Sequence, residues 1–240
     1  MAELFIELFS EEIPAKLQID ARQKIKKIIE ERLQKSEIKF NSSKSFSTPQ
    51  RLVFVIDGIP EKVEEKKKVL KGPKVGAPEV AIDGFIKSNN LNRKDIYKKN
   101  IEKGEFYFAE TKPKVINILE ELQSIIPQVL QSYSWKKSMK WSVYDLSWAR
   151  PLKSIIALFN NKIVNFKFFH IHSSNTTFVE GMNEDKKKKV ISFNSYLKIL
   201  QSQDVILDQE KRREMIIRKM NTICKSRNLK NNFDQKLIEE

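Results

Sequence analysis

Cysteine, histidine and glycine are scarce in this chain, whose 240 residues include one cysteine, two histidines and six glycines. A single cysteine, Cys224, excludes a disulfide framework and a cysteine-ligated zinc site, and it fits a reducing compartment. No apolar run approaches the roughly 18 residues that a membrane-spanning helix needs, and the N-terminal run MAELFIELFSEE is too short and too acidic for a signal peptide. We therefore expect a cytoplasmic protein with no membrane partner.

Sequence patterns of catalysis are also missing. Three of the six glycines lie between Gly72 and Gly84, but no GxxxxGK(S/T) or GxGxxG run is present, so they do not form a phosphate-binding loop. No nucleophile turn of a Ser-His-Asp or Cys-His arrangement occurs. His170 and His172 fall on one side of an expected strand without a third ligand, which favours strand histidines over a metal site. The sequence predicts no catalytic, cofactor-binding or metal-binding residue.

Positive charge, in contrast, is plentiful. The chain has 45 lysines and arginines against 31 aspartates and glutamates, a formal net charge of +14. A basic surface attracts phosphate and releases counterions when it binds nucleic acid. Lys, Asn and Ile are all abundant, however, as A/T-rich coding bias also produces, and most lysines are then solvated surface. Because no RRM, KH or zinc signature is present, RNA binding is expected to be weak and largely independent of sequence.

The first part of the chain predicts a strand, a helix and a strand. Apolar and other residues alternate over 3–9, the period of a strand, and apolar residues then recur at helical spacing over about 14–35. Ser10 is the candidate cap of that helix. Residues 52–56 alternate again and predict the second strand.

The middle of the chain is less regular. Residues 61–71 are a mixed charge run, typical of a linker or a solvated helix, and a short helix is expected around 80–89. The run KGEFYFAETK predicts a hairpin strand. An amphipathic pattern over 115–133 predicts a helix, which Pro127 should kink or divide.

Segment 138–169 predicts a buried hairpin. The apolar run 154–159 and the alternating run 164–168 flank Asn160-Asn161, a pair that tolerates positive φ in a turn. The three tryptophans of the chain lie within this segment or just before it, at Trp135, Trp141 and Trp148. Neighbouring lysines make a base-stacking platform conceivable, but the two apolar strands favour burial of the tryptophans.

Two helices are expected near the C-terminus, with Ser192 and Asp208 as their N-caps. The second helix carries both an apolar stripe and many basic residues, an arrangement that can lie on RNA or simply keep a helix solvated. The stripe consists of Met215, Ile216, Met220, Ile223 and Cys224.

Several blocks resemble, in the right order, motifs of the bacterial-type glycine–tRNA ligase β subunit. FIELFSEEIPAK resembles E-hydrophobic-x-TEELPA, FSTPQRLVFVI resembles F-x-TPRRL-A-V, and SMKW with WARPLKSIIALFNNKIV resembles pK-x-MRW with F-x-RP-x-x-W-hydrophobic. The ordered set covers the chain from Glu3 to about Arg213. Two departures are visible: Gln50 replaces the first arginine of a pair, and 179–182 lacks the histidine and arginine of a GHRF-like motif.

The resemblance implies a function. This chain would be the N-terminal portion of a longer β subunit that supports ATP-dependent attachment of glycine to its tRNA through contacts with tRNA and the catalytic α subunit, in an α2β2 complex, without a catalytic centre of its own. ATP and Mg2+ would be bound by the α subunit, and no DNA partner is implied. The motif positions that are candidates for tRNA or partner contact are Glu11, Glu12, Arg51, Lys140 and Arg150. For Glu11, Glu12 and Arg51, however, the residues by themselves favour a structural explanation, namely a helix start and a strand-entry turn.

We expect an α+β fold in four parts. These are a strand–helix–strand unit at 1–68, a small inserted helix and hairpin region at 69–134, a tryptophan-rich β region at 135–182 packed against the first unit, and a helical region at 183–240. Two other functions stay open: a stand-alone basic RNA-binding module, and a degenerate, inactive remnant of the β subunit. The remnant is motivated by the end of the chain at residue 240 and by the departure at 179–182.

Overall fold

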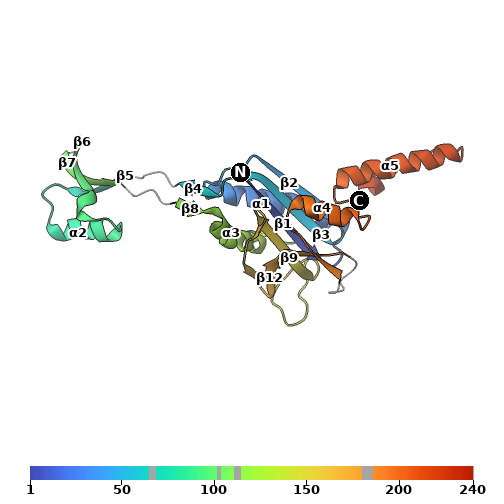
Figure 1. Ribbon diagram of the computed structural model, residues 1–240, viewed down its shortest axis with the longest axis horizontal. Coiled ribbons are helices and arrows are strands. Elements are labelled where there is room, and N and C mark those ends of the chain that lie inside the picture. The colour runs from blue at the N-terminus through green and yellow to red at the C-terminus, as the bar shows by residue number, and fades with distance from the viewer. Residues whose placement is uncertain (65–68, 102–103, 111–114, 180–185, 240) are drawn as a thin grey trace. The chain divides into compact units, whose positions relative to one another are not determined.

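The computed structural model confirms an α+β fold. It describes residues 1–64, 69–101, 104–110, 115–179 and 186–239. The chain divides into two compact units, the first formed by 1–61 with 118–240 and the second by 62–117 (Figure 1). None of the described helices is both long and apolar enough to cross a membrane.

The first unit is built on a mixed sheet with β1 near its middle. Its strand order is β11-β12-β9-β1-β3-β2, and β10 pairs with β9. Every pairing is antiparallel except that of β12 with β9. The strands are β1 (Ala2–Ser10), β2 (Ser42–Thr48), β3 (Arg51–Ile59), β9 (Leu152–Phe159), β10 (Lys162–Ile163), β11 (Lys167–Phe168) and β12 (Ile171–Ser174).

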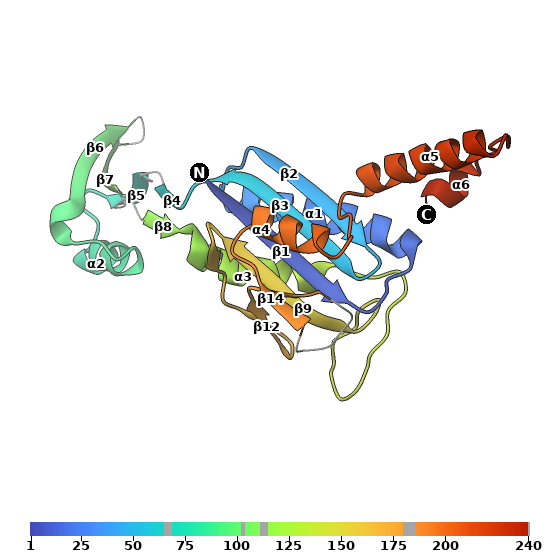
Figure 2. The same ribbon diagram turned by 45° about the vertical axis from the view of Figure 1, so that its right-hand side comes forward.

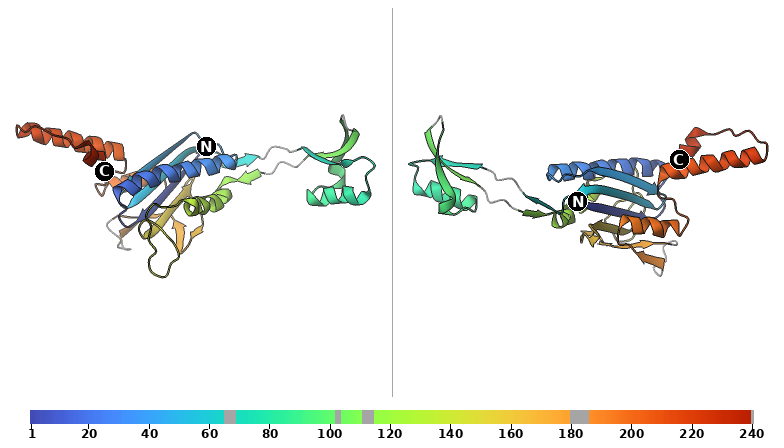
Figure 3. Two further views of the ribbon diagram at one scale, coloured as in Figure 1. Left: turned by 180° about the vertical axis from the view of Figure 1, so that it is seen from behind. Right: turned by 45° about the horizontal axis from the view of Figure 1, so that its top comes forward.

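Helices cover both faces of this sheet. On one face lie α1 (Ala15–Lys35) and α3 (Ile118–Ser132), which pack on each other, and on the opposite face lies α4 (Phe193–Gln201) (Figures 2 and 3). Phe5 belongs to the apolar cluster under α4, together with Tyr196 and Leu200. Because successive strand residues face opposite ways, the alternation over 3–9 serves two buried faces, and all of β1 except Glu3 is buried.

Two details of the helices on this face concern the start of α1 and the proline inside α3. Ser10 is the last residue of β1 and donates its hydroxyl to the Glu11 carbonyl, so the prediction that it caps α1 is wrong. The N-cap position of α1 is Pro14, without a side-chain cap. The helix α3 runs undivided through Pro127.

The predicted hairpin is partly confirmed. Asn160 and Asn161 adopt positive φ values of 47° and 62° and connect β9 to β10. The second arm leaves the ladder after Ile163, earlier than the alternation over 164–168 suggests. Two of the three tryptophans, Trp135 and Trp148, are buried as expected and pack edge to face with ring centroids 5.1 Å apart.

The second unit contains two small sheets and a helix. The strands β4 (Lys62–Glu64) and β8 (Val115–Asn117) pair with each other, and β5 (Val69–Lys74), β7 (Gly104–Glu110) and β6 (Ile96–Ile101) form a three-stranded sheet in that order. The helix α2 (Glu79–Ser88) lies where a helix was expected, and a 3-10 turn, η1, spans Arg93–Asp95. Part of the charge run expected to be a linker or a solvated helix is therefore strand, and its residues 65–68 lie outside the described residues.

The observed division of the chain differs from the four expected parts. The inserted unit spans 62–117, not 69–134, because α3 packs on α1 in the first unit. The region expected to be helical, 183–240, also contains the short strand β14 (Lys187–Lys189), which pairs with β13 (Thr176–Phe178).

The C-terminal helices begin at the predicted caps. The Ser192 hydroxyl accepts a hydrogen bond from the Ser195 amide at 3.2 Å, at the start of α4. An Asp208 carboxylate oxygen accepts bonds from the Glu210 and Lys211 amides at 3.0 and 3.3 Å, at the start of α5 (Gln209–Ser226). A short helix, α6 (Gln235–Glu239), follows. No residue of α5 is buried, so the predicted stripe is not a core face of this unit.

Candidate functional site

Arg51, one of the five predicted contact residues, lies inside the first unit. Its side chain is 7% exposed, and its Nε donates to Glu7 Oε1 at 3.1 Å. A terminal nitrogen donates to the Phe178 carbonyl at 2.7 Å, and the guanidinium lies 4.7 Å from the centre of the Phe9 ring. These contacts engage the Arg51 guanidinium inside the first unit.

The partner of Arg51, Glu7, is the centre of a buried polar cluster. Its Oε1 also accepts hydrogen bonds from Thr177 Oγ1 at 3.0 Å and from the Tyr196 hydroxyl at 2.7 Å. Burial raises the pKa of the Glu7 carboxyl, although the charge of Arg51 and these hydrogen bonds lower it. Burial and the neighbouring carboxylate raise the pKa of Tyr196 well above its ordinary value. The cluster joins β1, β3, β13 and α4, and no sequence pattern indicated that these four elements meet at one carboxylate.

The other four predicted contact residues lie at or near the surface. Glu11 is half-buried and pairs with Lys153 at 3.2 Å, whereas Glu12 is exposed. Lys140 is exposed and pairs with Asp145 at 3.2 Å. The half-buried Arg150 donates to the carbonyl before it, at 3.3 Å. Within the described part of the chain, no hydrogen bond or ion pair joins any two of the five predicted residues.

The two histidines do not form the expected pair on a strand. His170 lies in the turn before β12, where its ring stacks on Tyr144 with centroids 3.5 Å apart, and His172 lies in β12. Burial lowers the pKa of His170. Among the described residues, no group of three or more His, Cys, Asp or Glu side chains could hold a metal ion.

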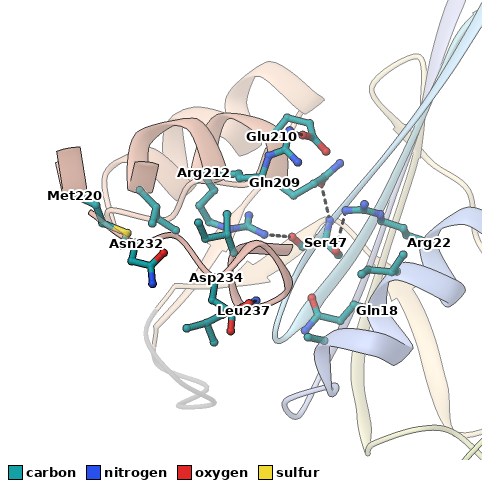
Figure 4. Close-up of a pocket in the computed structure, with 15 residues that line it drawn as sticks. Gln18, Arg22, Ser47, Gln209, Glu210, Arg212, Met220, Asn232, Asp234 and Leu237 are labelled. Carbon is teal, nitrogen blue, oxygen red and sulfur yellow. Dashed lines mark hydrogen bonds and ion pairs between the residues drawn. The ribbon is translucent and has the colours of Figure 1, made fainter. Parts of the chain in front are cut away.

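A cavity of about 580 Å³ lies beside the first turns of α1, between the end of β2 and helices α5 and α6 (Figure 4). Its lining mixes charged and apolar side chains. The charged ones are Arg22, Glu210, Arg212, Arg213 and Asp234, and the apolar ones include Ile19, Ile216, Met220 and Leu237. The partly exposed apolar stripe of α5 thus contributes to a cavity wall.

Two arginines of the lining, Arg22 and Arg212, form hydrogen bonds with Ser47 at the end of β2. Arg212 donates to the carbonyls of Ser47 at 3.0 Å, Ile206 at 2.6 Å and Leu207 at 3.1 Å, so it fastens the start of α5 to the end of β2. Arg22 reaches the Ser47 hydroxyl from α1 at 3.4 Å (Figure 4). Desolvation lowers the pKa of both arginines, and the charge of Arg22 lowers that of Arg212 further.

The other charged side chains of the cavity lining are Arg213, Glu210 and Asp234. Arg213 pairs with Glu210 at 3.3 Å, while its buried Nε has no hydrogen-bond partner among the described residues. Asp234 accepts from two amides at the start of α6. Three arginines against two carboxylates leave one formal positive charge in the lining of the cavity. Of these residues, the sequence indicated only that α5 is basic; it could not show that α1 and β2 meet it.

Comparison with known proteins now identifies the class and the family. The matching proteins are aminoacyl-tRNA synthetase subunits. Within that class, the chain belongs to the glycyl-tRNA synthetase beta subunit family, whose family model matches residues 4–240.

Curated relatives agree with this family. The chain is 36% identical over 240 residues to a glycine–tRNA ligase beta subunit of Rickettsia typhi, and 37% and 35% identical to those of Rickettsia bellii and Rickettsia prowazekii. Each match covers 100% of this chain but 36% of the relative. The chain therefore spans about a third of the length of these relatives and corresponds to their N-terminal portion.

Proposed function

We propose that this chain is the N-terminal part of a glycine–tRNA ligase β subunit. In this role it supports the ATP-dependent attachment of glycine to its tRNA by contacting both the tRNA and the α subunit, and it has no catalytic centre of its own. The observation that carries the proposal is the family match over residues 4–240. ATP and Mg2+ then belong to the α subunit of an α2β2 complex, and the complex works in the cytoplasm.

The surface of the chain supports contact with a polyanion. The net charge is +14, and the predicted contact residues Lys140 and Arg150 keep part of their side chains in solvent. Arg51 does not belong to this contact surface, because its donors point into the protein.

Co-purification tests the proposal. The chain is mixed with the tagged α subunit of the same organism and, in a separate experiment, with tRNA. We expect the α subunit to retain the chain, and we expect the tRNA to bind with an affinity that falls as salt is raised.

Two results would count against it. RNA binding without any retention by the α subunit would favour a stand-alone basic RNA-binding module. Loss of both interactions in a folded chain would favour an inactive remnant.

A further inference from the structure

The three-stranded sheet of the inserted unit has two unlike faces. A Cβ at Gly72 in β5 would meet the Phe85 ring of α2 at 2.8 Å, so α2 lies on the side that Gly72 faces (Figure 2). Lys71, the preceding residue, faces the other way. Its Nζ lies 3.9 Å from the centre of the Phe106 ring in β7. Phe106 is therefore on the face opposite to α2.

Strand register brings more rings and lysines to the same face. Phe108 lies two residues after Phe106, and both Lys71 and Tyr97 are its partners across the ladder, while Lys99 is paired with Phe106. The rings of Tyr97 and Phe108 stack with centroids 6.2 Å apart, and Lys99 Nζ lies 5.9 Å from the Phe108 ring. We call these five residues, Lys71, Tyr97, Lys99, Phe106 and Phe108, the aromatic face.

The small core of the unit lies on the other side. Ala109 in β7 is fully buried there, with Leu70 and Ile96 as its ladder partners, and α2 contributes the buried Ile82. On the aromatic face, Tyr97 is 40% exposed, Phe106 is half-buried and both lysines are exposed, whereas Phe108, in the central strand, is only 8% exposed. Three rings thus lie on a face that α2 does not cover, although the burial of apolar surface would favour the opposite side.

Charge points to the kind of molecule that this face fits. Residues 62–117 contain 14 lysines and arginines and 8 aspartates and glutamates, so the unit carries a formal charge of +6. Aromatic rings alternating with cations on an open sheet are the chemistry on which unpaired bases stack while the lysines meet phosphates. A duplex keeps its bases stacked on each other and cannot offer them to a flat sheet face.

We infer that the aromatic face binds unpaired RNA, with bases stacking on the rings of Tyr97 and Phe106 and phosphates meeting Lys71 and Lys99. The inference rests on the proposed function only in taking tRNA as the natural source of that RNA. In the free protein, the Lys71 ammonium lies over the Phe106 ring. In the proposed complex a base stacks on this ring instead, and Lys71 turns to a phosphate.

Direct binding to the full 240-residue chain tests this. The probes are a fluorescent 12-nucleotide RNA of mixed sequence, the same strand annealed to its complement, and the single strand with 2-aminopurine at its centre. We expect tighter binding of the single strand and quenching of 2-aminopurine, because the base stacks on protein. Tyr97→Ala should weaken single-strand binding about tenfold, whereas Tyr97→Phe keeps the ring and most of the affinity.

A charge-matched pair of variants separates the face from the net charge. Lys99→Gln should weaken binding and reduce the salt slope by about 1. Lys87→Gln, in α2 on the other side of the sheet, removes the same charge and should change the slope much less. Equal losses from the two variants, or equal binding of single strand and duplex, would overturn the inference. Should Tyr97→Ala lower the melting temperature, Lys99→Gln and the 2-aminopurine signal still decide.

The outcomes also separate this inference from the proposed function. Retention by the α subunit without any effect of Tyr97→Ala on RNA leaves the function standing and removes the aromatic face. Single-strand binding that depends on the Tyr97 ring, without retention by the α subunit, supports the aromatic face and counts against the proposed function.

Discussion

At Glu7, one carboxylate oxygen accepts three hydrogen bonds inside the first unit, and the other has no partner among the described residues. Breaking such a buried pair strands a charge, which costs about 3–5 kcal/mol. We therefore expect Arg51→Ala to lower the free energy of unfolding by roughly that amount, measured in urea. Removing the partly exposed pair through Lys153→Ala should cost about 1 kcal/mol or less.

A stable Arg51→Ala variant that has lost tRNA binding would show instead that Arg51 is a contact residue. The motif suggested Arg51 as a candidate, but its partner could not be seen from the sequence. Glu7 lies 44 residues earlier, and only the register of β1 against β3 brings the two together.

The raised pKa of Glu7 makes stability depend on pH. The folded protein holds this proton more tightly than the unfolded chain, whose carboxyl has a pKa of 4.5. The contribution to stability is thus fully present below pH 4.5 and is lost as the pH rises through the folded pKa. The groups that face this carboxyl are Arg51, Thr177 and Tyr196.

Unfolding measured from pH 4 upward should therefore show a downward contribution in the wild type that Glu7→Gln lacks. Glu12→Gln, an exposed control, should keep the wild-type slope. Identical slopes for the wild type and Glu7→Gln would mean that the folded and unfolded pKa values of Glu7 are equal.

The tryptophans differ in burial. Trp148 is 1% exposed and packs against Trp135 and Phe168, whereas Trp141 is half-buried. Trp148→Ala should destabilise the fold by roughly 3–5 kcal/mol, because it empties a packed site. Trp141→Ala should cost clearly less. An unchanged melting temperature for Trp148→Ala combined with lost RNA binding would reverse the assigned roles.

At the scale of elements, strong periodicity was sufficient to predict β1, α1 and β3 as a strand, a helix and a strand. Periodicity did not predict β2, because its residues SSKSFST show no apolar alternation. The segment is a strand because it pairs with β3 at the edge of the sheet. The predicted caps Ser192 and Asp208 act locally and were confirmed. Ser10 was not, since the chain stays in the sheet through that residue.

Two side chains attach the start of α5 to β2: Gln209, which contacts the backbone of Ser45 and Ser47 at 3.5 and 3.4 Å, and Arg212, which makes more and shorter hydrogen bonds. Arg212 binds three carbonyls, two before α5 and one in β2. Arg212→Ala should remove these links and increase amide hydrogen exchange in the first turns of α5. Lys211→Ala, at the exposed neighbouring position, should leave exchange there unchanged. If exchange rises equally in both variants, the loss reflects helix charge and not the contacts to the carbonyls.

At the scale of the whole molecule, the resemblance predicted the family, while the boundaries of the inserted unit depended on contacts that the sequence does not display. The expected end at residue 134 joined α3 to the inserted region, yet α3 packs on α1, far away in the chain. The cavity beside α1 has the same origin, because it combines residues of α1, β2 and α5. Neither the boundaries of the inserted unit nor the cavity follows from local pattern.

The last prediction concerns activity. Aminoacylation needs a site that grips ATP, positions a carboxylate for attack and stabilises the charge on the transferring group. Two of the arginines that could serve are committed elsewhere: Arg51 holds Glu7, and Arg212 holds backbone carbonyls. We therefore expect the chain alone to show no glycine-dependent pyrophosphate exchange. With the α subunit added, we expect little tRNA charging, since the chain spans 36% of the length of its relatives. Exchange by the purified chain that Arg51→Ala or Arg150→Ala abolishes, with folding preserved, would reveal a catalytic centre within these 240 residues.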